Sequence, residues 1–289
     1  MGKTGTKQSS IEGEKSLPEL PEVETVKRTL KNLVQGKTIR DITVSLPRII
    51  KHPDINQFRK LLQGTTITDI GRRGKFLKIY MNPWVLVSHL RMEGKYRVSD
   101  QSEPIEKHTH VIFHFTDGTE LRYKDVRQFG TMHLFPVGEE EKELPLKKLG
   151  PEPLSDDFQL SWFSETLVKR KTKIKSVLLN QEYLVGLGNI YVDEALYLAG
   201  IHPERAASSL SNDEIKRLYE AIRQTLQTAI EAGGSSVRSY LNGEGEMGMF
   251  QLQIQVYGRK NEPCHRCGHP ISRIVVAGRG THLCVQCQK

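Results

Sequence analysis

Cysteine placement constrains this chain more than any other feature of its sequence. All four cysteines lie within the last 26 residues, as the pairs Cys264–Cys267 and Cys284–Cys287, and sixteen residues separate the pairs. Each CxxC pair places two thiolates on one tight turn, and two such turns complete the tetrahedral shell of a zinc ion. Four thiolate ligands leave no position for a water molecule. The spacing therefore predicts one structural Zn²⁺ ion, with no catalytic metal and no small-molecule cofactor.

The segment between the two cysteine pairs reads as two strands around a turn at Gly278-Arg279-Gly280. This pattern predicts a zinc-stapled β-hairpin with Arg279 at its turn. Two interpretations of Arg279 are open. It is either an ordinary solvated turn arginine or a phosphate contact, because a guanidinium binds phosphate through two parallel hydrogen bonds and glycine neighbours permit close approach.

The charge balance indicates a polyanionic partner. The formal net charge is +8, and each phosphate contact made by a basic residue releases counterions. Alone this is weak evidence, because many basic proteins bind no nucleic acid. No apolar run approaches the ~20 residues that span a bilayer, and the N-terminus lacks the apolar segment of a secretory signal. We therefore expect a cytoplasmic protein without membrane contacts, in which two disulfides would be out of place.

Hydrophobic spacing divides the chain into a β-rich part and a helical part. Apolar residues at helical spacing over residues 23–34 predict an amphipathic helix that starts beside Pro18. Short β-rich runs over residues 37–137, separated by turn signals, predict an antiparallel β-sandwich. Residues 155–232 read as helical, with LVKRKTKIKSVLL among the clearest segments. The predicted fold class is α+β.

Two glycine- and proline-rich regions mark the predicted domain boundaries. The predicted units are a disordered leader over residues 1–17, an N-terminal β-sandwich domain flanked by helices over 18–150, a helical domain over 151–250 and a zinc finger over 251–289. We expect the protein to be a monomer.

The segment PELPEVETV, which starts at Pro18, resembles the opening of a known family, the formamidopyrimidine-DNA glycosylases, in which the mature chain begins at that proline. The resemblance covers essentially all of residues 18–289. Further segments match in the family's order: GRRGKFL, SHLRMEGKY, YKDVRQFGTMHLF, KIKSVLLNQEYLVGLGNIYVDEALYLAGIHP, GGSSVRSY and VYGRKNEPC. The long fourth segment resembles a helix–two-turns–helix element. The resemblance implies a bacterial base-excision-repair enzyme that removes 8-oxoguanine and formamidopyrimidines from damaged duplex DNA, in the cytoplasm at the nucleoid.

The resemblance implies a catalytic group made of Pro18, Glu19, Lys75 and Arg279. An N-terminal proline offers a secondary α-amine with a pKa near ~7.7–8.0, so a useful fraction is neutral and nucleophilic at cellular pH. Attack at C1′ expels the base and leaves an iminium, whose fixed positive charge promotes β,δ-elimination. Glu19 is the expected acid–base residue, and its alternative is a first-turn carboxylate that interacts with the helix dipole. Lys75 is expected to contact phosphate or lesion, and its alternative is a solvated hairpin lysine.

Seven further residues are implied as DNA contacts: His89, Arg91, Met92, Arg127, Phe129, Lys175 and Asn189. Met92, Arg127 and Phe129 match the family residues that fill the space left by an extruded nucleotide. Core burial is the alternative for Met92 and Phe129, but their polar, turn-like surroundings favour function. Asn189 is expected to contact phosphate, to cap the helix that follows, or both. Lys175 is expected on a basic, solvated helix face that the family uses on DNA.

A predicted lesion pocket combines Glu22 with the loop that follows Gly234. Its residues are Glu22, Ser235, Val237, Arg238, Ser239 and Tyr240. The loop is rich in backbone donors, which would contact the flipped purine through N–H groups. For Glu22, a helix-dipole carboxylate is nearly as good an interpretation.

Two alternative functions remain open. Endonuclease VIII, which prefers oxidised pyrimidines, shares the proline chemistry but typically opens with PEGPE rather than PELPE. A non-catalytic zinc-hairpin protein that binds damaged DNA would keep the basic charge, the zinc and Arg279. It would need neither the Pro18-Glu19 pair nor Lys75.

Residues 1–17 conflict with the proline chemistry, because an internal proline nitrogen is a tertiary amide without a nucleophilic lone pair. We hypothesise that translation starts at Leu17, where the family has its initiator methionine, since a UUG leucine codon is a common bacterial start. The stretch Glu12-Gly13-Glu14-Lys15 can be encoded by a purine-rich ribosome-binding sequence. The alternatives are proteolytic removal of the leader and a chain that binds damage without cutting.

Overall fold

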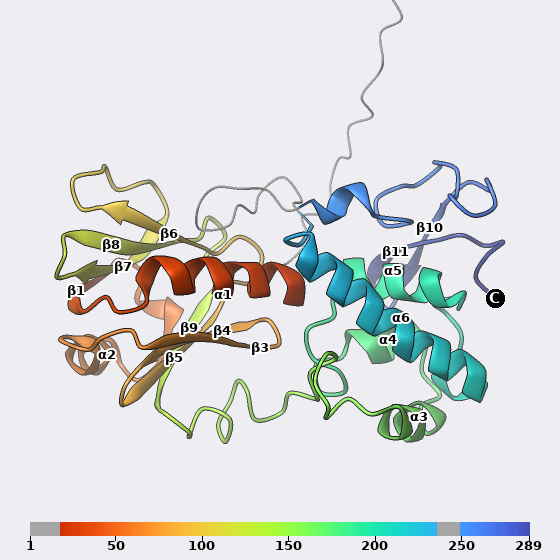
Figure 1. Ribbon diagram of the computed structural model, residues 1–289, viewed down its shortest axis with the longest axis horizontal. Coiled ribbons are helices and arrows are strands. Elements are labelled where there is room, and N and C mark those ends of the chain that lie inside the picture. Colours follow the sequence, from red (N-terminus) through yellow and green to blue (C-terminus); the bar gives the residue numbers. More distant parts are fainter. Residues whose placement is uncertain (1–17, 236–248) are drawn as a thin grey trace, which may run out of the picture.

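The computed structural model describes residues 18–235 and 249–289. Figure 1 shows two β-sheets at one end of the molecule and a group of helices at the other, with helix α1 running along the sheets toward the helical end. The C-terminal strands β10 and β11 lie beside the helices. The predicted α+β class is therefore confirmed.

Helix α1 (Leu20–Val34) packs one apolar face against the β-sandwich. Val23, Val26, Leu30 and Val34 recur at helical spacing and are at most 2% exposed, as the sequence pattern predicts. Glu19 is the residue before the helix, and the Glu22 side chain accepts a hydrogen bond from its backbone N–H at 2.9 Å. This contact satisfies one of the free donors at the helix start. The buried face fixes the helix on the sheets and so places Glu19 at the edge of the helical domain.

Two facing sheets form the predicted sandwich. One has the order β1 (Ile39–Val44), β7 (Thr109–Phe115), β8 (Thr119–Lys124) and β6 (Lys95–Asp100). The other has the order β2 (Ile50–His52), β9 (Thr131–Pro136), β5 (Trp84–His89), β4 (Phe76–Met81) and β3 (Asp69–Arg73). The inward-facing apolar side chains of both sheets and of α1 form one core. All pairings are antiparallel except that of β2 with β9, which is parallel.

The sequence pattern misses one helix in the β-rich part. Residues 55–62 form α2 (Ile55–Leu62), whose start is capped by the Asp54 carboxylate through two backbone N–H groups. Phe58 and Leu62 are buried in the sandwich core. A short 3₁₀ helix, η1 (Pro47–Ile49), precedes β2. The Asp54 cap and the apolar spacing at four residues are the helix signals, and the surrounding β-rich runs obscure them.

The helical end contains α3 (Leu160–Val168), α4 (Ile174–Leu179), α5 (Asn189–Ala199) and α6 (Asn212–Glu231), with 3₁₀ helices η2 (Ala207–Ser209) and η3 (Phe250–Leu252). Their apolar faces share a second core. The expectation of one helix over LVKRKTKIKSVLL is wrong, because residues 169–173 are not helical. The carbonyls of Arg170 and Thr172 instead accept hydrogen bonds from the backbone around η2. Among the described residues, no helix is long and apolar enough to cross a membrane.

The predicted C-terminal hairpin consists of β10 (Ser272–Val276) and β11 (Arg279–Leu283). The observed turn is Ala277-Gly278, with φ of 52° and 71°, which are the left-handed values that a tight two-residue hairpin requires. The predicted turn is therefore shifted by one residue, and Arg279 is the first residue of β11. The hairpin packs on α5 through a small cluster that includes Tyr197, Ile271 and Cys284.

Candidate active site

Glu19 lies at the junction of the two parts of the molecule, directly after the buried Pro18. Its side chain is 1% exposed, and its two carboxylate oxygens accept hydrogen bonds from the backbone N–H groups of Gly188 (2.7 Å) and Ile190 (3.0 Å). These donors belong to the start of α5, where a helix favours a negative charge. A Cβ atom at Gly188 would lie 2.3 Å from the Glu19 carboxyl carbon. Glycine at position 188 is therefore what allows the helix to receive this carboxylate.

Burial raises the pKa of Glu19 from its ordinary 4.5 to about 7. The neighbouring Glu22 carboxylate raises the pKa further, whereas the charge of Lys75 and the two backbone donors lower it. A carboxyl group with a pKa near neutrality can both donate and accept a proton at cellular pH. This environment favours the acid–base interpretation of Glu19 over a simple helix-dipole contact, which would hold the group ionised.

Glu22 anchors the segment that begins the predicted lesion loop. Its Oε1 accepts hydrogen bonds from the Tyr191 hydroxyl (2.5 Å), the Ser235 backbone N–H (2.7 Å) and the Ser235 hydroxyl (2.9 Å). Gly234 has a φ of +83°, and a Cβ there would lie 2.9 Å from the same oxygen. Glu22 thus joins α1, α5 and residue 235. Val237, Arg238, Ser239 and Tyr240 lie outside the described residues.

Lys75 lies in the turn between β3 and β4, as predicted, and it faces the same carboxylates. Burial lowers the pKa of Lys75 from 10.5, the charges of Glu19 and Glu22 oppose that shift, and Arg279 adds to it. The pKa of Lys75 is thus influenced by the charges of both Glu19 and Arg279. Three of the four predicted catalytic side chains therefore interact electrostatically through Lys75. Arg279 itself is exposed, so its guanidinium is available to a solvent-borne anion.

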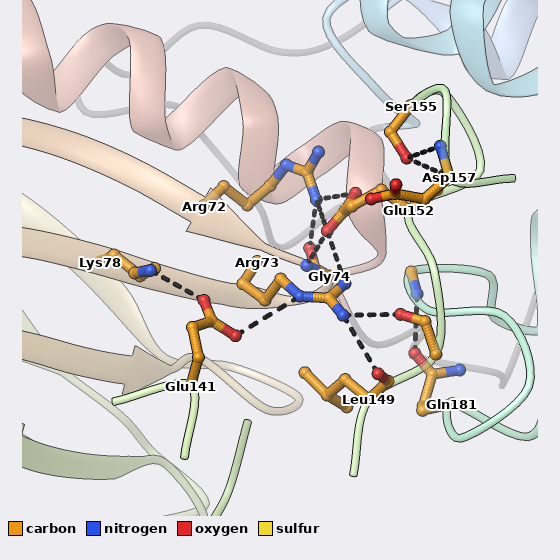
Figure 2. Close-up of polar contacts among 12 residues, drawn as sticks. Arg72, Arg73, Gly74, Lys78, Glu141, Leu149, Glu152, Ser155, Asp157 and Gln181 are labelled. Atoms are coloured by element: carbon orange, nitrogen blue, oxygen red, sulfur yellow. Dashed lines mark hydrogen bonds and ion pairs between the residues drawn. The ribbon is translucent and has the colours of Figure 1, made fainter. Parts of the chain in front are cut away.

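A polar clamp holds the β3–β4 turn against the segment that links the two parts of the molecule (Figure 2). The Glu152 carboxylate accepts hydrogen bonds from Arg72 (2.9 Å), Arg73 (3.3 Å) and the backbone N–H of Gly74 (2.5 Å). Arg73 also donates to the carbonyls of residues 149 and 150. The clamp therefore fixes the residue directly before Lys75.

The same turn also contacts the loop that receives Glu19. A Cβ at Gly74, where φ is +56°, would lie 2.2 Å from a methyl carbon of Val185, so the two backbones approach closely. The backbone N–H of Gly150 donates to the Gln181 carbonyl at 2.9 Å, and the Gln181 side chain accepts from Gly186 N–H at 2.8 Å. The turn carrying Lys75 and the loop leading to Gly188 are thus one connected structure.

Lys175 does not lie on a solvated helix face, and that expectation is wrong. Its side chain is fully buried, and its Nζ contacts Asp193 Oδ1 at 2.6 Å and Thr281 Oγ1 at 2.8 Å. The other Asp193 oxygen accepts from the His282 backbone N–H at 2.8 Å. A buried ammonium needs such compensation, because it has lost its hydration. In this structure Lys175 joins α4 and α5 to strand β11, and no surface of it is open to a phosphate.

Asn189 is the first residue of α5, and Gly188 occupies the cap position, so the predicted capping role is wrong. The Asn189 Nδ2 group donates to the Gly280 carbonyl at 2.9 Å. Its Oδ1 is buried and has no hydrogen-bond partner among the described residues. Asn189 therefore stands between the start of α5 and the residue that follows Arg279, and the phosphate contact stays a prediction.

The four cysteine sulfurs form a compact cluster, with every pair within 4.8 Å. Cys264 and Cys287 are 3.9 Å apart, and Cys267 and Cys284 are 3.5 Å apart. A tetrahedral zinc ion with Zn–S bonds of about 2.3 Å separates its sulfurs by roughly 3.8 Å, whereas a disulfide needs about 2.0 Å. The spacing fits zinc, and the site is a structural zinc site that closes the hairpin carrying Arg279.

Replacement of Cys284 by serine should remove zinc from the protein and release the hairpin from α5, because folding of such modules depends on the metal. We expect loss of the stoichiometric zinc measured by elemental mass spectrometry and a weakening of DNA binding of about tenfold or more. Val285→Ser, at the neighbouring exposed position, should keep both properties. Retention of one zinc per chain in Cys284→Ser would contradict the four-cysteine shell.

Three predicted DNA contacts lie on two loops at the open end of the sheets. Phe129 is 52% exposed, and the Arg127 guanidinium lies 5.1 Å from its ring centre; both side chains are on the surface, which excludes the core alternative for Phe129. Met92 is half-buried in the other loop. The exposed ring of Phe129 is therefore available to a partner surface.

His89 and Arg91, which precede Met92, lie in different environments. His89 is 8% exposed, its ring packs edge-on against Phe76, and its Nδ1 accepts a hydrogen bond from the Arg91 backbone N–H at 2.9 Å. Burial lowers the pKa of His89 to about 3, and the charges of Arg91 and Lys75 act in the same direction. His89 is therefore neutral, and it holds the backbone of the exposed Arg91 at a φ of 54°.

Sequence reasoning missed the residues that hold this site together. Asp193, Gly188 and Tyr191 each contact a predicted site residue, and Glu152 holds the turn that carries Lys75. Their partners lie between 18 and 169 positions away in the chain, so no local spacing pairs them. One sequence signal was available for Asp193. It lies inside the apolar run NIYVDEALYLA, and a carboxylate buried in such a helix requires a cation or a hydrogen-bond donor as its partner.

Three family models match the chain. They are the Formamidopyrimidine-DNA glycosylase N-terminal domain over residues 17–132, the Formamidopyrimidine-DNA glycosylase H2TH domain over residues 149–240, and the zinc finger found in FPG and IleRS over residues 261–289. Together these matches extend over most of the chain.

Similar proteins and structures agree with these matches. A formamidopyrimidine-DNA glycosylase of Brevibacillus brevis is 61% identical over 274 residues, covering 94% of this chain and 99% of the relative. That of Bacillus subtilis is 58% identical over 273 residues, with the same two coverages. The crystal structure of a Lactococcus lactis FPG mutant with Fapy-dG containing DNA has a TM-score of 0.90 at 46% identity, covering 94% of this chain and all of that one. A complex of the Lactococcus lactis protein with abasic-site DNA has a TM-score of 0.89.

Proposed function

This chain belongs to the formamidopyrimidine-DNA glycosylase family, and we propose that it excises oxidised purines from duplex DNA and cuts the strand through a Schiff base on Pro18. The glycosylase activity and a role in base excision repair follow from the family. The lesion preference and the residue roles are our proposal. The observation that supports them most directly is Glu19, buried between Pro18 and the start of α5 with a pKa near neutrality.

Pro18 is the proposed nucleophile. Its neutral α-amine forms a bond to C1′ of the damaged nucleotide, the N-glycosidic bond breaks, and the base leaves with the bonding electrons and a proton. The C1′–O4′ bond of the sugar ring then breaks with its electrons on O4′, and the C1′–nitrogen bond becomes an iminium. The iminium withdraws electrons from the sugar, so loss of a C2′ proton breaks the 3′ C–O bond and a further elimination breaks the 5′ C–O bond. Both flanking phosphates remain on the DNA ends. Pro18 must be the first residue of the active form, which fits a start at Leu17.

Glu19 is the proposed acid–base group. Opening of the sugar ring places a developing alkoxide on O4′, which the protonated Glu19 carboxyl neutralises, and the carboxylate then accepts protons during elimination. The α5 backbone donors hold both oxygens in place, so the group needs no reorganisation during the reaction. This dual use fits a buried carboxyl that, among the described residues, is held by backbone donors rather than by a direct ion pair.

Lys75 and Arg279 supply the positive charge beside this group. Lys75 interacts electrostatically with Glu19, Glu22 and Arg279, and its proposed role is to bind a phosphate or the lesion at the reacting nucleotide. Arg279 is exposed on the zinc hairpin and is the proposed phosphate clamp of that nucleotide. The bound zinc keeps the hairpin folded, and the buried Lys175–Asp193 pair docks it on α5.

Surface residues are proposed to hold the DNA. Met92, Arg127 and Phe129 fill the space left by the extruded nucleotide, and Arg127 contacts the base opposite it. Arg91 and Asn189 contact phosphates, and Glu22 with the loop from Ser235 forms the lesion pocket. We further propose that the protein works as a monomer on nucleoid DNA in the cytoplasm, and that the domain boundaries lie at residues 150/151 and 250/251.

A direct test compares two duplexes that differ only in the lesion. With a chain that begins at Pro18, single-turnover excision of 8-oxoguanine should exceed excision of thymine glycol by about tenfold or more, since pocket contacts discriminate at that level. The products should carry a phosphate at both ends of the gap. Faster removal of thymine glycol would favour the oxidised-pyrimidine alternative. Binding without cleavage of either duplex would favour the non-catalytic one.

A further inference from the structure

A fully buried carboxylate organises the loop that carries Arg127 and Phe129. Asp125 is 0% exposed and lies at the end of β8. Its Oδ1 accepts hydrogen bonds from the backbone N–H groups of Arg127 (3.1 Å) and Gln128 (3.0 Å), and its Oδ2 accepts one from Gly130 (2.8 Å). Gln128 has a φ of 59°, so the loop adopts a backbone shape that side-chain-bearing residues rarely choose. Three backbone donors on one carboxylate maintain that shape.

The hydroxyl of Tyr123 connects this loop with the loop that carries Met92. The Tyr123 hydroxyl lies 3.4 Å from Asp125 Oδ2. A Cβ at Gly130 would lie 1.7 Å from this hydroxyl, and a Cβ at Gly94 would lie 2.3 Å from it. The hydroxyl is therefore enclosed between two glycine backbones, one from each loop. Tyr123 itself is fully buried, and its ring packs at a tilt of 56° against that of Tyr96, so its position is fixed from the core side.

These contacts give the two loops one common anchor. Met92 is two residues before Gly94, and Phe129 directly precedes Gly130, so the anchor lies beneath the side chains that point outward. The functional side chains have few restraints of their own: Phe129 is 52% exposed and meets Arg127 through a ring contact at 5.1 Å. Their mutual position therefore depends on the backbone that Asp125 and Tyr123 hold.

We propose that Asp125 and Tyr123 are positioning residues that set the joint geometry of Met92, Arg127 and Phe129, and thereby the reading of the base opposite the lesion. This inference rests on the proposed function of those three side chains. Asp125 and Tyr123 do not touch DNA. They hold the two loops in a fixed position relative to each other. Met92 and Phe129 can then enter the vacated space while the Arg127 guanidinium contacts the opposite base.

Asp125→Asn is the sharpest variant, because it keeps the shape but turns one acceptor oxygen into an NH₂ group that faces a backbone N–H. We expect the rate of 8-oxoguanine excision opposite cytosine to fall about tenfold to a hundredfold, because a small misplacement of contacting groups lowers rates by factors of this size. The ratio of rates opposite cytosine and opposite adenine should also move toward one. Strand cleavage at an abasic site in single-stranded DNA needs no opposite base and should stay within about twofold of the unmodified protein.

Matched variants separate positioning from loss of folding. Tyr123→Phe removes only the hydroxyl and should shift the opposite-base ratio in the same direction by a smaller factor. Asp156→Asn, at an exposed aspartate of the linking segment, should change nothing. An unchanged opposite-base ratio in both Asp125→Asn and Tyr123→Phe would overturn the proposal, and so would an equal loss on single-stranded DNA. Inactivity of the unmodified protein on every substrate would instead reject the proposed function.

Discussion

A chain that begins at Pro18 should form a borohydride-stable covalent complex with abasic-site DNA, and the same chain with residues 1–17 retained should form none. Only the first chain has a free secondary amine, because the upstream peptide bond converts the proline nitrogen into an amide. We expect the loss to be complete, because the proposed Schiff base forms on the α-amine that the retained leader blocks. Denaturing gel electrophoresis of the trapped complex measures it directly.

Lys75 makes this experiment discriminating. Lys75 carries a primary amine that interacts electrostatically with Glu19, and a lysine amine can form a Schiff base with a carbonyl carbon. Trapping of the leader-bearing chain would therefore assign the Schiff base to a lysine rather than to Pro18. A chain that begins at residue 18 with Pro18→Gly is the matched control, because its primary amine should still be trapped, though more slowly. Failure of the Pro18 chain itself would reject covalent catalysis.

The local sequence predicts the catalytic and zinc-binding residues of this site better than it predicts the contacts that hold those residues in place. The PELPE motif identifies Pro18 and Glu19, and the CxxC pairs identify the zinc shell, because each motif is a short segment in which neighbouring residues act together. The donors to Glu19 are 169 and 171 positions away, and only the docking of α1 against the start of α5 brings them together. The raised pKa of Glu19 results from burial by that docking, so it could not be predicted from the residues that neighbour Glu19 in the sequence.

Lys175 shows how the same reasoning fails. Its neighbours Arg170 and Lys171 suggest a solvated basic face, but both lie in the non-helical residues 169–173 that precede α4. The change of direction turns Lys175 inward to Asp193 and the hairpin. At Arg279 the error is one residue, because Ala277 and Gly278 adopt the left-handed conformation of the turn and Arg279 is the first residue of β11. Both errors concern backbone direction, which composition and spacing describe least well.

Glu19→Gln should lower single-turnover excision by about 10²- to 10⁴-fold, the usual range for a positioned acid–base group. The amide keeps the size of the carboxyl, but it cannot donate a proton to a ring oxygen with comparable ease, and its NH₂ must face one of the two backbone donors of α5. Glu220→Gln, at an exposed site on α6, is the control. The thermal midpoint of each variant shows whether the active site is still assembled.

The pH profile distinguishes an acid from a merely structural carboxylate. Reaction requires a neutral Pro18 amine, whose pKa is ordinarily about 7.7–8.0, and a protonated Glu19, whose pKa is raised to about 7. The rate should therefore rise with pH on the acid side as the amine loses its proton, and fall on the alkaline side as Glu19 loses its own. Since the glutamine cannot ionise, Glu19→Gln should keep the rise and lose the fall. A preserved alkaline decrease in that variant would mean that another group supplies the proton.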